Sequence, residues 1–582
     1  MEDGTLLELT EKRLRNFARK KTLLELTTQR IVENISFFSK KNKQFSSLPA
    51  HLREKLLHKL TDFKCATDAG DKAEFERRLN AFKNLLCLGM KKVKLDGLMT
   101  FCPEPLKLEQ ITKVVKLIAT YATNIKSLTI NEIRGKTGYS YTYDVSLGRD
   151  ILKAIGELKE LRKLELLNLN IAYSELKTIC TKTLPNLEYI YCSRIIYDLE
   201  GDPKDDEENF RLSFLNLRYF FFDYVLPFTR NLGPILNKDF VNLSVKHLPK
   251  LEVVEEYFDN NIKNVAPNCY GFPVLPKHIS ALRHLNACPS AFGLHLKFPD
   301  VTHLTINFFD WDHDKRNIAD FFKFNKIQGL HLYNAPSSHI VYRFLKNYGQ
   351  NLQYLILTDN DAIDIELKFR LIFKLCPKLQ RLRLSCVDMI DDWRQIEFFS
   401  ELKEFSCTPY RTAYLSNILS APLLEKVVFG GILFDPDDLK IVSAMILEKK
   451  ILKRLSTLHF DCCTTDDELD PTDPDDSAVM RELGNMMKIA LAFLPELSDV
   501  NALFCSTRES PKIDSPYIPD FGILGLKMIA DEELINMLIA FKRSMVILPS
   551  KSNSSRWGIY AICSIFGIIS IVIINQSRVF KK

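Results

Sequence analysis

The sequence contains little glycine and none of the short motifs that mark the common enzyme classes. Only 21 of its 582 residues are glycine, which is few for a fold built around phosphate-binding loops. The patterns G-x-S-x-G, H-E-x-x-H and G-x-x-x-x-G-K-[ST] do not occur in the chain. Three of its dispersed histidines, His51, His58 and His284, lie in ordinary helical or repeat contexts. We therefore expect no intrinsic catalysis and no cofactor.

Metal-binding patterns are missing as well. The cysteines run from Cys65 to Cys563 without C-x-x-C pairs, so the sequence does not support a structural zinc site. The acidic segments 201–209 and 466–476 lack the spacing of a calcium-binding loop. Their Pro and Asp residues disfavour helix and strand, so we expect both to be exposed, solvated loops without a metal.

The chain also lacks an apolar leader and a strongly basic body. Its opening, MEDGTLLELTEKRLRNF, is too charged for a secretory signal peptide, which predicts a reducing cytosolic or nuclear setting. Residues 1–60 hold 13 Lys/Arg against 7 Asp/Glu, which leaves 66 of each in the remainder (79 − 13 and 73 − 7). Because the basic residues of this arm alternate with apolar ones in a helical pattern, we expect no nucleic-acid partner.

What the sequence does contain is one phrase, apolar-x-x-apolar-x-apolar, many times over. Twelve intervals cover the 330 residues between Ile125 and Leu455, or about 27 residues each, which is within the range of leucine-rich repeats. Clear copies begin at Ile125, Leu161, Leu187, Leu217, Val301, Ile327, Leu352, Leu379, Leu402, Leu424 and Leu455, and weaker copies begin at Met90, Leu251, Leu282 and Leu497.

Each copy predicts a short strand followed by a helical stretch. The last two apolar residues alternate along the strand and point inward, and the stretch between copies carries apolar residues at helical spacing. One unit cannot bury its own apolar face, so neighbours must stack, with a parallel sheet lining a concave surface. The alternative is two-stranded or helical-repeat packing with a fortuitous leucine spacing.

The phrases resemble those of the leucine-rich-repeat family in its irregular, intracellular form. The full L-x-x-L-x-L-x-x-N signature occurs only from Leu352 to Asn360. The resemblance implies an α/β fold, a leucine-rich-repeat solenoid (horseshoe) over residues 85–510. A helical region, 1–84, precedes it, and a cap and linker, 511–556, follow.

The residue between the paired strand apolars faces outward and is available to another protein. These positions are Glu165, Tyr191, Phe221, Thr305, His331, Ile356, Arg383, Ser406, Val428 and His459. Aromatic residues and arginine dominate interface energetics. We therefore predict substrate-binding roles for Tyr191, Phe221, His331 and Arg383, the alternative for the two aromatics being burial under a loop.

Two amphipathic helices are predicted before the repeats. The hexapeptide TLLELT occurs at residues 5–10 and again at 22–27, and from Thr22 the apolar residues fall mainly on one helical face. After the polar loop SKKNKQFSS comes SLPAHLREKLLHKL, in which Pro49 suits the first turn of a second helix.

This pair of helices resembles the N-terminal boxes of substrate receptors of elongin–cullin-2 ubiquitin ligases. The family's elongin-binding box, Thr/Ser/Pro-Leu-x-x-x-Cys-x-x-x-aliphatic, is matched from Thr22 by Leu23, Thr27 and Ile31, with Thr27 in place of Cys. The resemblance implies that Leu23 and Ile31 enter an apolar groove on elongin C. The copy that begins at Thr5 also fits the box, but it lies farther from the second helix.

The family's cullin box, aliphatic-Pro-x-x-aliphatic, is matched by Leu48, Pro49 and Leu52 and implies a contact with the cullin scaffold. An F-box is an alternative, since its helices also begin with Leu-Pro and also precede leucine-rich repeats. The following segment lacks the F-box Cys-x-x-Trp, and the first tryptophan of the chain is Trp311. A further alternative is that residues 1–60 only cap the open apolar end of the solenoid.

The longest apolar run lies near the end of the sequence. Residues 557–574, WGIYAICSIFGIISIVII, are 18 uncharged positions, enough to cross a bilayer. Trp557 and Tyr560 suit one membrane interface, and basic residues follow the run. We predict a transmembrane tail anchor that leaves the repeats on the cytoplasmic face of an intracellular membrane. The alternatives are a buried terminal helix or a non-native end of the translated gene. In either case we expect the protein to be cytoplasmic or nuclear.

Together these features predict a substrate-recognition adaptor that links proteins held on the repeats to elongin B/C and a cullin ubiquitin ligase. The rival hypothesis is a tail-anchored leucine-rich-repeat scaffold without a ligase.

Overall fold

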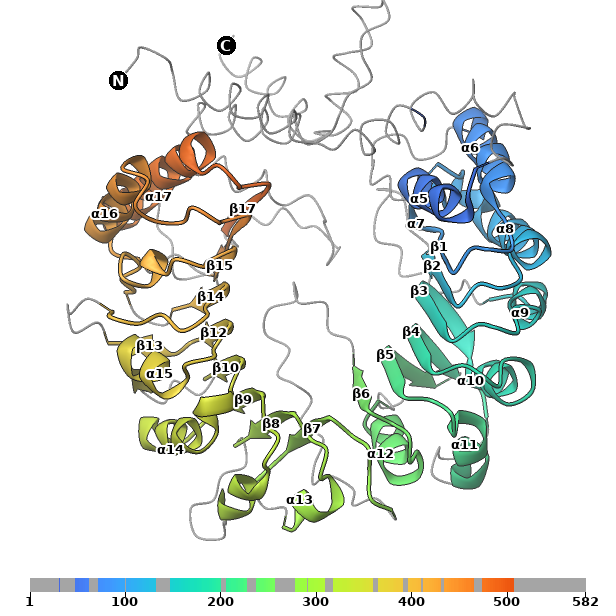
Figure 1. Ribbon diagram of the computed structural model, residues 1–582, viewed down its shortest axis with the longest axis horizontal. Coiled ribbons are helices and arrows are strands. Elements are labelled where there is room, and N and C mark those ends of the chain that lie inside the picture. Colours follow the sequence, from blue (N-terminus) through green and yellow to red (C-terminus); the bar gives the residue numbers. More distant parts are fainter. Residues whose placement is uncertain are drawn as a thin grey trace, which may run out of the picture. The chain divides into compact units, whose positions relative to one another are not determined.

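Figure 1 shows the computed structural model of the chain. It describes residue 31 and residues 48–61, 72–99, 101–131, 147–199, 206–227, 237–256, 278–289, 292–308, 318–359, 365–390, 396–409, 412–430, 434–464 and 474–506. The chain divides into two compact units, with most of residues 22–284 in the first and most of residues 301–550 in the second.

Every copy of the repeated phrase forms a strand that begins two residues after its first apolar residue. The first unit has a six-stranded sheet of β1 (Lys92–Lys94), β2 (Ser127–Asn131), β3 (Lys163–Ala172), β4 (Tyr189–Tyr197), β5 (Tyr219–Pro227) and β6 (Val253–Glu256), in that order. The second sheet has nine strands: β7 (His284–Ala287), β8 (His303–Asn307), β9 (Gly329–Tyr333), β10 (Tyr354–Thr358), β12 (Arg381–Ser385), β14 (Glu404–Thr408), β15 (Lys426–Gly430), β16 (Thr457–Thr464) and β17 (Asp499–Ser506).

The strand pairs whose register is defined are parallel, and each unit is an α/β stack of leucine-rich-repeat type. In most repeats, the second residue of the phrase donates its N–H to the carbonyl of the corresponding residue in the preceding repeat. Arg162 donates to Lys126 at 3.0 Å in the first unit, and Gln353 donates to Gln328 at 2.7 Å in the second. These bonds join successive repeats just before their strands begin.

Helices and short turns return the chain between strands. In the first unit they are α5 (Ala50–Thr61), α6 (Lys72–Leu85), α7 (Asp96–Met99), α8 (Lys107–Tyr121), α9 (Arg149–Gly156), α10 (Tyr173–Thr178), the π-helical η2 (Ile179–Thr183), α11 (Glu207–Phe214) and α12 (Asn237–His247). Later helices are α13 (Leu294–Lys297), α14 (Ser338–Tyr348), α15 (Phe369–Leu375), α16 (Pro436–Leu447) and α17 (Pro474–Phe493). A small parallel pair, β11 (Glu366–Leu367) and β13 (Asp388–Met389), accompanies the second sheet.

The apolar residues of the phrase form the core between strands and helices, as the alternation predicts. In β9, β10 and β12 the inward residues are leucines with at most 2% of their surface exposed. In the first unit, aromatic rings replace leucines between β4, β5 and the neighbouring helices, with centroids 4.9–6.3 Å apart. This aromatic core comprises Tyr173, Tyr197, Phe210, Phe214, Phe220, Phe222 and Phe240.

The predicted parallel sheet is confirmed for the part of the chain that the structure describes, but it is divided in two. The strands form two main sheets, and the division falls between β6 and β7, which follow the weak copies at Leu251 and Leu282. The phrase LEVV carries no third apolar residue at its expected place, since Glu256 stands there. The strand pairing ends here, although the Arg283 N–H still donates to the Glu252 carbonyl at 2.7 Å.

The acidic segments were predicted to be loops, which is wrong at their C-terminal ends. Glu207 begins α11, and Pro474 begins α17. Acidic residues at a helix N-terminus interact favourably with the helix dipole, and proline is tolerated in the first turn. Pro and Asp favour loops, but the same residues also favour the first turn of a helix, and here the helix forms.

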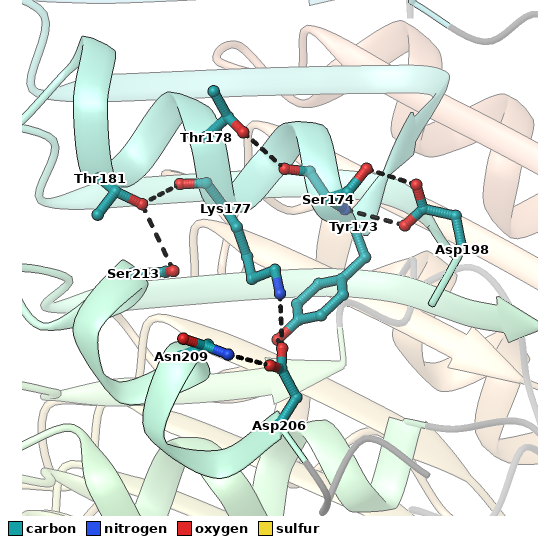
Figure 2. Close-up of polar contacts among 9 residues, drawn as sticks. All are labelled: Tyr173, Ser174, Lys177, Thr178, Thr181, Asp198, Asp206, Asn209 and Ser213. Atoms are coloured by element: carbon teal, nitrogen blue, oxygen red, sulfur yellow. Dashed lines mark hydrogen bonds and ion pairs between the residues drawn. The ribbon is translucent and has the colours of Figure 1, made fainter. Parts of the chain in front are cut away.

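A polar network holds the beginning of α11 against α10 (Figure 2). The ammonium of Lys177 lies 2.6 Å from the Asp206 carboxylate, which also accepts hydrogen bonds from Tyr173 Oη at 3.3 Å and Asn209 Nδ2 at 2.7 Å. Burial, together with the Asp206 charge, raises the pKa of Tyr173, so its hydroxyl stays protonated and donates. These contacts join α10 to the start of α11 in the next repeat.

Three predicted segments cannot be compared with the structure. Residues 557–574, the predicted tail anchor, and residues 511–556 lie outside the described residues, as does most of 1–47. In the parts of the chain that are described, no helix combines the length and apolar character that crossing a bilayer requires.

Candidate protein-binding surface

The strand register places the predicted outward residues in single rows across each sheet. In the first unit, Glu165 lies beside Tyr191, which lies beside Phe221. In the second, the row is Thr305, His331, Ile356, Arg383, Ser406, Val428 and His459. All ten side chains are partly or fully exposed, whereas the residues on either side of each are buried along most strands. The outward position is therefore confirmed, and a substrate-binding role stays a prediction.

Four aromatic side chains gather on the outward face of β4 and β5. We call Tyr189, Tyr191, Tyr219 and Phe221 the aromatic patch; each is half-buried. The Tyr189 ring centroid lies 5.9 Å from that of Tyr219 and 5.5 Å from that of Phe221. These spacings are typical of interacting aromatic pairs, so the rings support one another while one side of each stays accessible.

Polar groups fix the rings of the aromatic patch in place. The Lys163 ammonium lies 4.0 Å from the Tyr189 ring centroid, a cation–π contact. Tyr191 Oη donates to Asp223 at 2.8 Å, and Tyr219 Oη donates to Glu252 at 3.0 Å. Side chains held in one rotamer lose little conformational entropy when a partner binds.

An ion-pair ladder runs along the edge where β3, β4, β5 and β6 begin and ends at Arg283, directly before β7. We define the charge ladder as Arg162, Glu188, Arg218, Glu252 and Arg283, the second residues of consecutive phrases. Arg162 lies 3.4 Å and Arg218 lies 3.6 Å from Glu188. Arg218 Nε donates to Glu252 at 2.6 Å, and Arg283 Nε lies 3.1 Å from the same carboxylate. Consecutive repeats are therefore joined by side chains as well as by backbone.

Glu252 is the most enclosed member of the charge ladder, with 9% of its side chain exposed. Burial raises the pKa of its carboxyl, but the hydrogen bonds from Arg218 and Tyr219 and the charges of Arg218 and Arg283 outweigh burial and lower that pKa below its ordinary value. The carboxylate therefore stays ionised and anchors the Tyr219 ring.

The four predicted substrate-binding residues do not form one site. Tyr191 and Phe221 lie in the first unit, while His331 and Arg383 lie in the second, where Ile356 separates them in the row. Burial, with the Arg383 charge as a smaller cause, lowers the pKa of His331 to about 4, so the ring is neutral near pH 7. Its Nε2 lies 3.2 Å from Thr358 Oγ1. Arg383 is exposed.

Sequence reasoning missed Tyr189, Tyr219 and the charge ladder. The alternation along a strand gives two outward positions per phrase, the third residue as well as the fifth, and only the fifth was used. Tyr189 and Tyr219 occupy the third position of NLEYIYC and NLRYFFF, counted from the leucine. The ladder could have been found from the alternation of Arg and Glu at the second position, from Arg162 to Arg283.

The predicted docking boxes are described only in part. Leu23 and Thr27 lie outside the described residues, and Ile31 is a helical, half-buried residue. In the cullin-box match, Pro49 is exposed, and Leu48 and Leu52 are half-buried. The Pro49 carbonyl accepts the N–H groups of Leu52 at 3.0 Å and Arg53 at 3.1 Å, so the Leu-Pro pair stands directly before α5.

The remainder of α5 packs into the first unit. Leu56, Leu57 and Leu60 are buried, and α5 lies against α6, α7 and β1. The Arg53 guanidinium donates to the carbonyls of Leu85 at 3.0 Å and Asn84 at 2.9 Å, which lack partners within α6 at its C-terminus. This helix therefore packs on β1, the first strand that the structure describes.

Comparisons with known proteins give similarities of fold only. No protein-family model and no curated protein matches the chain. The chain is similar to a protein in the crystal structure of the yeast Rad7 and Elc1 complex, at 14% identity over 76% of this chain and 93% of that one, with a TM-score of 0.37. It is also similar to a chain of the TLR13–ssRNA13 complex, at 14% identity over 73% of this chain and 50% of that one, with a TM-score of 0.33.

A third similar structure is an internalin, InlF from Listeria monocytogenes, at 11% identity over 69% of this chain and 88% of that one, with a TM-score of 0.27. At these identities and TM-scores the similarity carries no conclusion about partners or activity. The repeat architecture rests on the register of this chain's own strands.

Proposed function

We propose that this chain is a non-catalytic, protein-binding adaptor that holds a target protein on its outward sheet surface. The observation that supports this function best is the aromatic patch. Its half-exposed rings lie on adjacent strands, and Lys163, Asp223 and Glu252 fix them. Rigid, partly exposed aromatics are the usual anchors of protein interfaces.

We further propose that the N-terminal segment docks onto elongin B/C and a cullin, which makes the chain a substrate receptor of a ubiquitin ligase. The exposure of Pro49 and the partial exposure of Leu48 and Leu52 support this, because the later leucines of α5 are buried. The adaptor would act by proximity, holding a target near catalytic subunits of the ligase. A cytosol-facing location is part of this proposal.

A pull-down with the full-length chain and purified elongin B/C tests the ligase link. We expect wild type to retain elongin, and Leu23→Asp to lose it because a charge cannot enter an apolar groove. Leu6→Asp, in the other TLLELT copy, is the matched control and should retain elongin. When purified cullin is added to the same pull-down, Pro49→Ala with Leu52→Asp should weaken capture of the cullin and leave capture of elongin unchanged.

Failure of wild type to bind elongin or a cullin would leave a second candidate function, a repeat scaffold without a ligase. The packing of α5 on β1 and α6 favours this alternative, since capping alone accounts for its buried leucines. Circular dichroism on each variant distinguishes a lost contact from a lost fold.

A further inference from the structure

The basic side chains of the first sheet are unevenly distributed over its outward face. Lys92 and Lys94 project from β1, and Lys91 and Lys126 stand directly before β1 and β2; all four are exposed. Within the described residues, none of the four side chains has an ion pair or a hydrogen bond. We call Lys91, Lys92, Lys94 and Lys126 the lysine cluster.

Several other charged side chains on this face are paired with opposite charges within the molecule. Lys163 lies 2.7 Å from Glu165, which also accepts a hydrogen bond from Thr129 at 2.7 Å. The arginines of the charge ladder lie beside Glu188 and Glu252. Near the cluster itself, the Glu54 carboxylate accepts the backbone N–H of Lys92 at 3.0 Å. Among the side chains that the structure describes, Glu54 is the one carboxylate bonded to the cluster, and the resulting excess of positive charge favours an anionic partner.

The lysine cluster and the aromatic patch lie on the same register rows. Lys92 pairs with Ser127, Ser127 with Lys163, Lys163 with Tyr189, and Tyr189 with Tyr219, across five adjacent strands. Neighbouring strands are about 4.8 Å apart, so Lys92 and Tyr219 are separated by about 19 Å along the row. An extended peptide, at about 3.3 Å per residue, covers that distance with about six residues.

We propose that this face binds an extended acidic segment of a partner protein. The carboxylates of the segment lie over the lysine cluster, and an apolar side chain about six residues away rests on the aromatic patch. This inference rests on the proposed protein-binding function and deepens it by naming the chemical class of the target. Opposite charges speed association and exclude basic competitors, while the apolar contact supplies most of the binding energy.

A nucleic acid is the less suitable occupant. Its phosphates recur along the whole strand, so a strand that crosses from the lysines to the rings would pass the carboxylates of Glu165 and Glu188. A peptide can place neutral residues at those points. Like charges brought together across an interface cost binding free energy, which favours the protein segment.

A purely structural explanation of the cluster must also be tested. β1 is an edge strand of its sheet in the described structure, and lysines on edge strands discourage pairing with other chains. Glutamate is also charged and also discourages pairing at an edge strand. Replacing the lysines by glutamate therefore distinguishes edge protection from peptide binding. Edge protection predicts no effect on peptide binding, while an acidic-segment site predicts a large one.

Fluorescence anisotropy with the full-length chain and synthetic probes tests the proposal. The first probe is a peptide with a run of glutamates and a leucine about six residues after it. In the second probe, glutamines replace the glutamates. In the third probe, serine replaces the leucine. A single-stranded oligonucleotide of equal charge is the fourth. We expect the first probe to bind at least about ten-fold more tightly than any other, with affinity that falls as salt rises.

Two variants locate the site. Lys92→Glu with Lys126→Glu should weaken the first probe about ten-fold or more, because attraction becomes repulsion. Lys113→Glu with Lys153→Glu makes the same change of charge on α8 and α9, where both lysines are exposed, and should change affinity less than about two-fold. Phe221→Ser should lower the affinity for the first probe, whose leucine contacts this ring, and leave the affinity for the serine probe unchanged.

Equal binding of the glutamate and glutamine probes overturns the proposal, as does equal loss with both double reversals. Tighter binding of the oligonucleotide assigns the face to nucleic acid and also overturns it. If Phe221→Ser weakens the probes while Lys92→Glu with Lys126→Glu does not, the acidic class is wrong and the protein-binding function stands.

Discussion

The second residue of the repeated phrase can be compared between the two units. In the first it is charged and forms the ladder Arg162, Glu188, Arg218, Glu252 and Arg283; in the second it is mostly neutral, as in Thr302, Gln328, Gln353, Gln380, Ser456 and Ser498. The backbone bond at this position is the same in both, between 2.7 and 3.0 Å. Stacking of repeats is therefore set by the backbone, and the side chains are free to determine surface chemistry.

The cores differ in the residues that their strands contribute. The inward residues of β5 are the rings of Phe220 and Phe222, whereas the inward residues of β9, β10 and β12 are leucines, which pack with the buried rings of Phe344 on α14 and Phe373 on α15. Larger side chains bury more apolar surface per residue but leave larger cavities when truncated. The two units thus reach the same architecture with different sensitivity to substitution.

The largest effect is expected from truncating the aromatic core. Phe222→Ala should lower the free energy of unfolding by about 3–5 kcal/mol, since its side chain is fully buried among other rings. Leu355→Ala, at an equally buried position of β10, is the matched change and should cost about 2–5 kcal/mol. Urea denaturation followed by circular dichroism measures both. A loss below 1 kcal/mol for Phe222→Ala would contradict the aromatic core.

A smaller effect separates the charged from the neutral ladder position. Glu252→Gln should cost about 1.5–3 kcal/mol, because it removes the charge that accepts bonds from Arg218 and Tyr219. The lowered pKa of Glu252 means that this stability is present above about pH 4.5 and is lost as pH falls through the folded-state pKa. Gln353→Ala, at the neutral position, should show no such pH dependence. Urea midpoints at pH 7 and pH 3 make the comparison.

The smallest expected effect on stability comes from His331, at a higher pH than the effect of Glu252. Because its pKa is lowered from 6.5 to about 4, the folded state binds the proton less readily than the unfolded state. Stability is therefore complete above pH 6.5 and declines as pH falls toward 4. His331→Gln should reduce the loss between pH 7 and 4 by about 1–3 kcal/mol, measured as urea midpoints. An unchanged acid profile would show that the ring does not titrate in this range.

The repeat architecture could be predicted because it depends on spacing alone. Fifteen phrases mark fifteen strands with a constant offset, since inward apolar residues and the turn before them are local properties. The break between β6 and β7 was not predicted because it depends on pairing between strands, and one phrase carries no information about its neighbour. The helical starts at Glu207 and Pro474 were missed because helix-dipole and loop preferences of the same residues compete.

The candidate surface was predicted in part. Tyr191 and Phe221 were identified from the alternation along their strands, and the structure places them outward. That they share a patch with Tyr189 and Tyr219 depends on the register between strands, which one phrase does not contain. His331 and Arg383 were grouped with them by residue type, but the structure separates them into the other unit.

The constant two-residue offset between phrase and strand has a practical consequence for engineering. In these repeats the strand begins at the same position of the phrase, and main-chain hydrogen bonds join neighbouring repeats. Such repeats should be exchangeable as units. Outward residues of β4 and β5 could be transplanted onto β10 and β12 without disturbing the leucines beneath. A chimera of this kind would carry the recognition properties of one region on the framework of the other.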